Sequence, residues 1–190
     1  MSVDNLDTMD THCEISYDIL KAIEICIEML NQRGYIIESK AMDTILARKE
    51  NESSNESSSY IIVFIADTSK LNIKNIEIYF SVMNKVKINN AIIIYKQSIT
   101  SFTKRTIAQS TDYNFEIFAV EDLQFNITKH RLQPDFSLLD KKAAEEIRKK
   151  YKSNIPVLRQ TDPISKFYAY KKGDVVCINR KNCVSYRIVK

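Results

Sequence analysis

The chain has 190 residues, of which 44% are hydrophobic and 27% charged, ordinary values for a globular protein of one or two domains. No window approaches the ~20 consecutive apolar residues that span a membrane. Residues 1–10 are acidic and contain no apolar core of a signal peptide. We therefore expect no membrane anchor and a location inside a cell or a virion.

The net charge of +4 conceals two regions of opposite sign. Residues 1–128 contain 12 lysines and arginines against 18 aspartates and glutamates, whereas residues 129–190 contain 16 against 6. A change of sign at one point predicts two modules with different partners. The chain also has 27 isoleucines and only 2 glycines, a bias typical of AT-rich coding DNA.

The four cysteines lie far apart and form no C-x-x-C pair, and the chain has only 2 histidines. These residues offer little from which to build a zinc site. We expect reduced, packed thiols and no metal. Cys177 and Cys183 are placed so that they could face each other across a hairpin.

Two helices are predicted at the start of the chain. Apolar residues recur every three or four positions from Ile15 to Leu30, which predicts an amphipathic helix closed by Gly34 in a left-handed cap. Residues 40–48 are expected to form a second helix. The run 50–59, E-N-E-S-S-N-E-S-S-S, has nothing to bury and predicts a mobile loop.

Strands and helices then alternate. The expected elements are a strand at 60–66, a helix at 75–86, a strand at 91–95, a helix at 100–110 and a strand at 114–120. Continuous apolar runs predict strands buried on both faces. This order implies right-handed crossovers and a mainly parallel sheet with helices on its faces, an α/β domain over residues 1–124.

Residues 125–190 are expected to form a separate, small α+β module. Its expected elements are a charged helix at 141–151 capped by Asp140, an extended piece at 155–158, a short helix from 162, a turn at 172–174, and strands at 175–178 and 184–189 joined by a polar tip at 179–182. Asp162 before Pro163 places a capping residue ahead of a first-turn proline.

Catalytic motifs are sparse. There is no G-x-S-x-G, glycine-rich phosphate loop or H-E-x-x-H. The enzyme alternative is a metal-dependent nuclease, since Glu38-Ser39-Lys40 and Asp140-Lys141-Lys142 match the D/E-x-K spacing. The first triplet is expected in a loop and the second at a helix cap, so neither lies in a central strand where a second acid converges. The basic residues of 141–150 suit nucleic acid, an acidic partner or a solvated helix face, and the sequence leaves these open.

Four motifs carry a family resemblance. Residues 125–134 read F-N-I-T-K-H-R-L-Q-P and resemble the entry to the assembly domain of RNA polymerase subunit five, which eukaryotic polymerases I, II and III share and which has an archaeal counterpart. D-P-I-S-K-F-Y from Asp162, K-K-G-D-V-V from Lys171 and Y-R-I-V from Tyr186 follow in the family's order. The run N-Q-R-G-Y that ends at Tyr35 is similar to the close of the family's first helix.

The chain also departs from that family. Thr161 and Ala169 stand where the family usually has glycine, so those two turns are expected to be made differently. The final hairpin is several residues short. Thr100-Ser101-Phe102-Thr103 replaces the family's T-P-S-A stretch near downstream DNA.

The resemblance implies a non-catalytic polymerase subunit with an α/β jaw domain, residues 1–124, and an α+β assembly domain, residues 125–190. The jaw would lie near downstream duplex DNA at Thr100, Lys104 and Arg105. The assembly domain would dock on the largest subunit. The expected interface residues are His130, Pro134, Asp162, Pro163, Tyr168, Lys172, Gly173 and Arg187.

The resemblance implies no cofactor, no catalytic residue and no small-molecule substrate. A cellular version would work in the nucleus, and a viral one in the virion and host cytoplasm; the isoleucine-rich coding and the short hairpin favour a virus. The alternative is a stand-alone DNA-binding or nuclease-like α/β protein.

Overall fold

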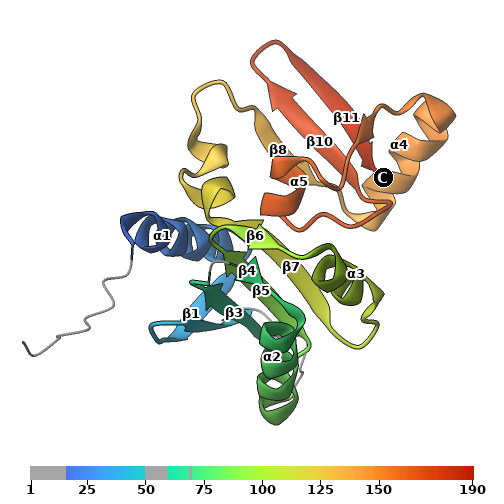
Figure 1. Cartoon of the computed structure of the whole chain (residues 1–190). Helices are drawn as coiled ribbons and strands as arrows, with labels where there is room; N and C mark the ends of the chain where they lie inside the picture. Colours follow the sequence, from blue (N-terminus) through green and yellow to red (C-terminus); the bar gives the residue numbers. More distant parts are fainter. Residues whose placement is uncertain (1–15, 50–59, 69) are drawn as a thin grey trace, which may run out of the picture.

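The computed structural model describes residues 16–49, 60–68 and 70–190, which form two packed units (Figure 1). The predicted loop 50–59 lies outside them. The first unit is a five-stranded sheet in the order β1-β2-β3-β5-β7. Its strands are β1 (Tyr35–Lys40), β2 (Thr44–Lys49), β3 (Tyr60–Ala66), β5 (Asn90–Tyr95) and β7 (Asn114–Ala119).

Helices cover both faces of this sheet. Helix α1 (Tyr17–Gln32) lies on one face, and α2 (Ile73–Val86) and α3 (Ser101–Gln109) lie on the other (Figure 1). The strands β3, β5 and β7 pair in parallel, and the helices connect them as predicted. Residues 61–64 and 91–94 are buried without interruption, because apolar layers press on both sides. Two short strands, β4 (Lys70–Leu71) and β6 (Ser98–Ile99), pair separately.

The predicted helix over residues 40–48 is wrong. That region is the hairpin β1–β2, and β2 also pairs antiparallel with β3. The sheet is therefore mixed and not mainly parallel. The reason is periodicity: Ile45 and Ala47 are buried while Leu46 and Arg48 are partly exposed, the alternation of two that a half-buried strand shows.

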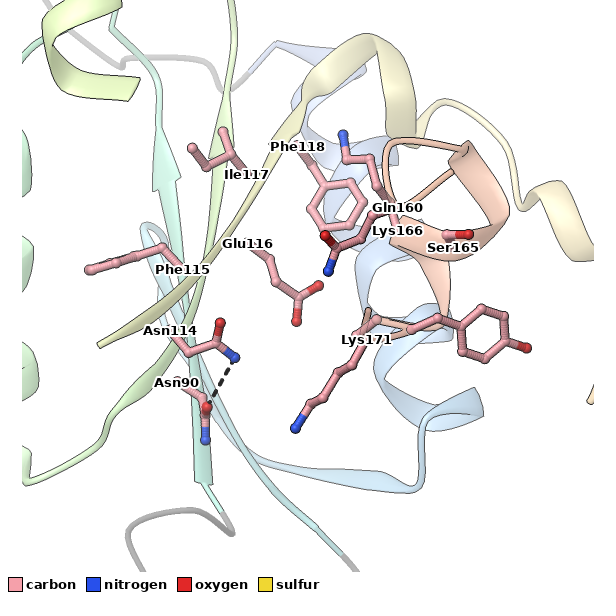
Figure 2. Close-up of a pocket in the computed structure, with 12 residues that line it drawn as sticks. Asn90, Asn114, Phe115, Glu116, Ile117, Phe118, Gln160, Ser165, Lys166 and Lys171 are labelled. Carbon is pink, nitrogen blue, oxygen red and sulfur yellow. Dashed lines mark hydrogen bonds between the residues drawn. The ribbon is translucent and has the colours of Figure 1, made fainter. Parts of the chain in front are cut away.

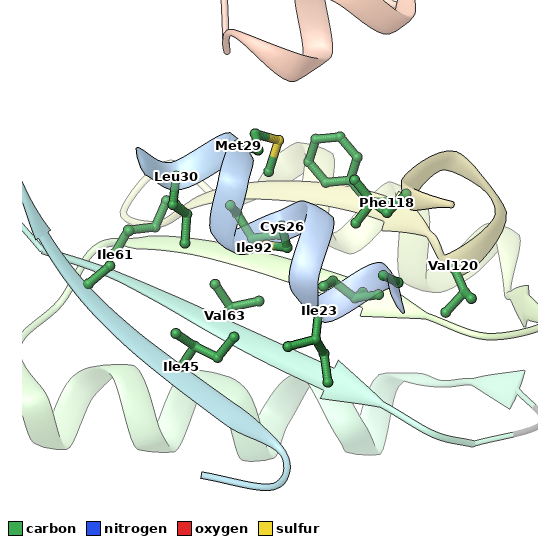
Figure 3. Packing of buried hydrophobic residues seen from close by; sticks show 14 of the residues in the cluster. Ile23, Cys26, Met29, Leu30, Ile45, Ile61, Val63, Ile92, Phe118 and Val120 are labelled. Atoms are coloured by element: carbon green, nitrogen blue, oxygen red, sulfur yellow. The ribbon is translucent and has the colours of Figure 1, made fainter. Parts of the chain in front are cut away.

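Helix α1 forms the core of the first unit with the sheet. Its apolar face lies over side chains of the strands, with Ile23, Cys26 and Leu30 facing Ile45, Ile61, Val63 and Ile92 (Figure 3). Burial raises the pKa of the Cys26 thiol to about 12, so this cysteine is a packed, protonated thiol as predicted. The helix ends at Gln32, and Gly34 closes it two residues later in the left-handed conformation, φ +81°, also as predicted.

The second unit is a four-stranded sheet in the order β8-β10-β11-β9 with helices around it. Its elements are β8 (Asp135–Leu138), α4 (Lys141–Tyr151), β9 (Val157–Leu158), α5 (Pro163–Phe167), β10 (Val175–Arg180) and β11 (Cys183–Val189). These confirm the expected α+β arrangement and add β8.

The hairpin of the second unit is tighter than predicted. Strand β10 runs to Arg180 and pairs it with Cys183, so the tip is residues 181–182 and not 179–182. Cys177 lies opposite Tyr186, so the two cysteines do not face each other. Within the described ranges, no helix combines the length and apolarity needed to cross a membrane.

Candidate functional site

The residues predicted near DNA lie at the start of α3. Thr100 caps the helix: its Oγ1 accepts the amide of Thr103 at 3.1 Å, and the two hydroxyls are 2.7 Å apart. Thr100 therefore has a structural role. Lys104 and Arg105 are exposed on the outer side of α3, beside a Phe102 side chain that is 65% exposed. In the described part of the chain, no ion pair engages either cation, so both charges are available to a ligand.

Three of the predicted interface residues fix the backbone locally. Asp162 caps α5, where its Oδ1 accepts the amide of Ile164 at 3.0 Å, and Pro163 occupies the first turn. Gly173 has φ +95°, its amide donates to the carbonyl of Val189 at 2.9 Å, and its own carbonyl accepts from Arg148. These residues hold the shape of a surface whether or not a partner touches them.

A second group of predicted residues lies beside the hairpin tip. The exposed His130 accepts the amide of Leu132 through Nδ1 at 3.3 Å. Pro134 lines a hollow with Arg131, Arg180 and Lys181. The structure thus separates the predicted interface into one group near α5 and another near the β10–β11 turn.

The other predicted interface residues differ in exposure. Tyr168 is half-buried and stacks on Tyr170, with ring centroids 5.4 Å apart, and burial raises its pKa. Lys172 is exposed and Arg187 is half-buried on β11. Among the residues described, neither cation has an ion-pair partner. Lys172 and Arg187 are the members of the predicted set best suited to contact an acidic surface.

The turn at Ala169 does not avoid the conformation of glycine, although the sequence led us to expect that it would. Ala169 adopts φ +54°, the left-handed conformation that glycine enters without strain. The backbone of this turn is therefore one that favours glycine, although the residue is alanine. Thr161 lies in a turn closed by the amide of Asp162 and the carbonyl of Arg159, 3.0 Å apart.

Arg33 joins the two units, a role that the sequence pattern offered no reason to expect. Its guanidinium makes a bidentate pair with Glu116, at 2.9 and 2.7 Å. It also donates to the carbonyls of Phe167 at 2.7 Å and Lys166 at 2.8 Å, at the end of α5. The Arg33 side chain is only 6% exposed. A buried cation with four donors engaged fixes the relative position of α1, β7 and α5.

The segment that enters the second unit is also tied to α1. Glu28 accepts from Asn126 at 2.7 Å and from Lys129 at 2.9 Å. The hydrogen bond from Asn126, followed by that from Lys129, lowers the pKa of Glu28. The side chain of Phe167, 3% exposed, belongs to the core of the first unit. These contacts cross the predicted domain boundary at 124/125.

The outer face of α4 is strongly basic. Arg148, Lys149 and Lys150 occupy its last turn, where positive charge also favours the helix dipole. The Lys150 ammonium lies 5.3 Å from the ring centre of Tyr151, and that ring lies 6.1 Å from Tyr186. The face suits either phosphate or carboxylate groups.

The nuclease-like triplets do not converge. Glu38 lies in the edge strand β1, not in a loop as expected, and pairs with Arg48 at 2.8 Å. Asp140 caps α4 as predicted, accepting the amide of Ala143 at 2.7 Å. Over residues 16–49, 60–68 and 70–190, no group of three or more acidic, histidine or cysteine side chains is placed to hold a metal ion.

The sequence compares closely with known polymerase subunits. Residues 125–189 match the family described as RNA polymerase Rpb5, C-terminal domain. A protein of Invertebrate iridescent virus 6 named as a DNA-directed RNA polymerase subunit is 35% identical over 185 residues, 90% of this chain and 98% of the relative. The RPABC1 subunit of RNA polymerases I, II and III from Dictyostelium discoideum is 30% identical over 185 residues, 90% and 94% of the two chains. Its Caenorhabditis elegans counterpart is 24% identical over 207 residues, 92% and 96%.

The second unit, an α+β module with a capped α5 and a glycine turn before its hairpin, is thus a domain of the RNA polymerase subunit class. The similarity extends over the first unit as well, since the relatives match nearly end to end. The chain belongs to the family of RNA polymerase subunit 5.

Proposed function

We propose that the chain is a non-catalytic subunit of a multisubunit, DNA-dependent RNA polymerase. Residues 125–190 dock on the largest subunit, and residues 1–124 form a jaw near downstream duplex DNA. The observation that carries the proposal is the similarity, over 90% of the chain, to two proteins named as RNA polymerase subunits. The subunit acts at sites of transcription, which for a viral version are the virion and the host cytoplasm.

The charge of the second unit supports docking. Its basic excess includes the exposed Lys172 and the half-buried Arg187, which have no ion-pair partner in the described part of the chain. The turns around them are fixed by Asp162 and Gly173. A rigid basic surface binds a complementary acidic one without losing much conformational entropy.

The first unit suits a local contact with DNA and not a tight grip. It is acidic as a whole, and repulsion between its carboxylates and phosphate limits its affinity for free duplex. Lys104 and Arg105 project from α3 and each neutralise a phosphate. The jaw therefore positions duplex that the rest of the polymerase already holds.

Two matched charge reversals in the full-length chain separate these roles. Lys104→Glu with Arg105→Glu should leave assembly into the polymerase unchanged, weaken retention of downstream duplex at low salt, and reduce the salt slope of binding by about two. Lys172→Glu with Arg187→Glu should lower affinity for the largest subunit about 10-fold and leave the intrinsic DNA contact of the jaw unchanged.

The readouts are co-sedimentation with the polymerase and duplex retention as a function of salt. Unchanged retention with the first pair would refute the DNA contact. Unchanged affinity with the second pair would refute this docking surface. A wild-type chain that never sediments with a complex far larger than 22.1 kDa would refute the subunit assignment.

A further inference from the structure

Strand β7 has one free edge. It lies at the end of the five-stranded sheet and, among the strands that the structure describes, pairs only with β5. The amide of Asn114 donates to Asn89 at 2.8 Å on the β5 side. Because backbone groups alternate in direction along a strand, the amides and carbonyls of Phe115 and Ile117 point the other way. The amide of Ala119, on this outer side, donates to the Asp122 carboxylate at 3.3 Å.

The outward groups of Phe115 and Ile117 have no backbone partner within the described residues. Unpaired amides and carbonyls along an edge are a template for another strand. Folded proteins commonly blunt such an edge with a charge, a proline or a covering loop. The sequence N-F-E-I-F-A has no proline, and its one charge, Glu116, is turned onto Arg33.

A groove of about 580 Å³ follows this edge. Residues 114–118 line it without interruption. Successive side chains of a strand point to opposite faces of its sheet. A groove that is lined by all five consecutive residues therefore runs along the edge of the sheet and not over one of its faces. Figure 2 shows the side chains of Phe115 and Ile117 on one side of the strand and those of Glu116 and Phe118 on the other.

The opposite wall of the groove comes from the second unit. Gln160, Lys166 and Lys171 line it (Figure 2). The Lys166 ammonium is paired with Asp122 at 3.2 Å. The Lys171 ammonium extends toward the groove and has no ion-pair partner in the part of the chain that the structure describes. An occupant with a carboxylate opposite Lys171 would match this wall in charge.

We propose that this groove binds an extended segment of another polymerase chain. The segment adds to β7 as a sixth strand and places an acidic side chain against Lys171. Main-chain hydrogen bonds to residues 115 and 117 provide the attachment, and Lys171 provides selectivity for acidic segments. This inference rests on the proposed function, since it takes the partner to be a chain of the polymerase.

Proline substitution tests the strand addition directly. Proline is tolerated at an edge strand when the lost amide faces outward, so Ile117→Pro should fold and yet remove a hydrogen bond to the added strand. Ile117→Ala is the matched control, because it removes a similar part of the side chain and keeps the amide. A photoreactive benzoylphenylalanine in place of Phe115 reports the occupant in the assembled polymerase, and mass spectrometry identifies the cross-linked peptide.

The expected result is a cross-link from position 115 to an acidic, extended segment of one other polymerase chain. Its yield should fall about 5- to 10-fold with Ile117→Pro, fall similarly with Lys171→Glu, and change little with Ile117→Ala. A probe at the exposed Leu132, in the other unit, should not label that segment.

Four outcomes overturn the proposal in distinguishable ways. If the chain assembles into the polymerase but position 115 labels no polypeptide, strand addition is wrong and the proposed function stands. The same holds if position 115 labels only this chain's own residues. Equal yields with Ile117→Pro and Ile117→Ala would refute the backbone pairing. Absence of the chain from purified polymerase would refute both proposals.

Discussion

The two units obtain their shape in different ways. The first has buried apolar strands between layers of helix, with two hydrophobic clusters, one on each face of the sheet. The second has a smaller cluster, and its surface depends on local devices such as the Asp162 cap and the Gly173 turn. Phe167 of the second unit also packs in the core of the first unit. A large core specifies a fold by itself, whereas a small module relies on caps, turns and its neighbour.

Removal of Arg33 should give the largest effect, because it breaks the joint between the units. Arg33→Met keeps much of the side-chain volume but leaves Glu116 and two carbonyls without their partner. We expect a loss of about 3–5 kcal/mol in the free energy of unfolding, measured by urea denaturation. The double variant with Glu116→Gln should lose less than the two single losses combined. A change below about 1 kcal/mol would mean that the units are stable without the joint.

Helix caps provide a like-for-like test across the two units. Thr100→Ala removes the cap of α3 and also leaves the buried Thr103 hydroxyl unpaired, so we expect a loss of about 2–3 kcal/mol. Asp140→Ala removes only the exposed cap of α4 and should cost about 1 kcal/mol. Thr100→Ser keeps the hydroxyl and serves as the control. Thermal or urea unfolding measures the loss of stability of each variant, and equal losses for Thr100→Ala and Asp140→Ala would contradict this prediction.

The Glu28 contacts predict a pH dependence of the link between α1 and residues 126–129. The pKa of Glu28 is lowered in the folded chain, so its ionised form stabilises folding above the unfolded pKa, and this contribution is lost as the pH falls through the folded pKa. Glu28→Gln should therefore be less stable than the native chain at about pH 7, and the difference should shrink toward about pH 3. A constant difference in urea midpoint across this range would contradict it.

The smallest effect is expected at Ala169. Glycine adopts φ +54° without the strain that a Cβ brings, but it gains more freedom in the unfolded chain. Ala169→Gly should therefore stabilise the chain by no more than about 1 kcal/mol. Serine at the same position is the control, because it keeps a Cβ. A loss of stability with glycine would show that the backbone strain is already relieved.

Much of the fold could be predicted because its signals are local. Residues 60–66 and 91–95 are apolar throughout, and the caps of α4 and α5 are read from Asp140 and Asp162. Strand β8 has only four residues, D-F-S-L, and no apolar run. The hairpin β1–β2 was not predicted, because its sequence mixes charged and apolar residues and the alternation of buried and partly exposed positions in β2 is short.

The joint between the units could not be predicted from the sequence. Arg33 meets Glu116 and Phe167, which follow it by 83 and 134 residues, and two of its bonds go to main-chain carbonyls that carry no side-chain signature. The free edge of β7 could not be predicted either, because the order of strands in a sheet decides which strand lies at its edge. The predicted local roles of Asp162, Pro163 and Gly173 are confirmed, whereas the contacts of the interface residues with a partner stay predictions.

The bonds from Arg33 to α5 end on peptide oxygens, which every amino acid possesses. Mutation at position 166 can therefore change the side chain that pairs with Asp122 and leave this acceptor in place. The side chains of α5 can therefore change over evolutionary time while the bonds from Arg33 hold the same angle between the first and second units. Variation of the side chain and permanence of the scaffold thus depend on different atoms of the same residue.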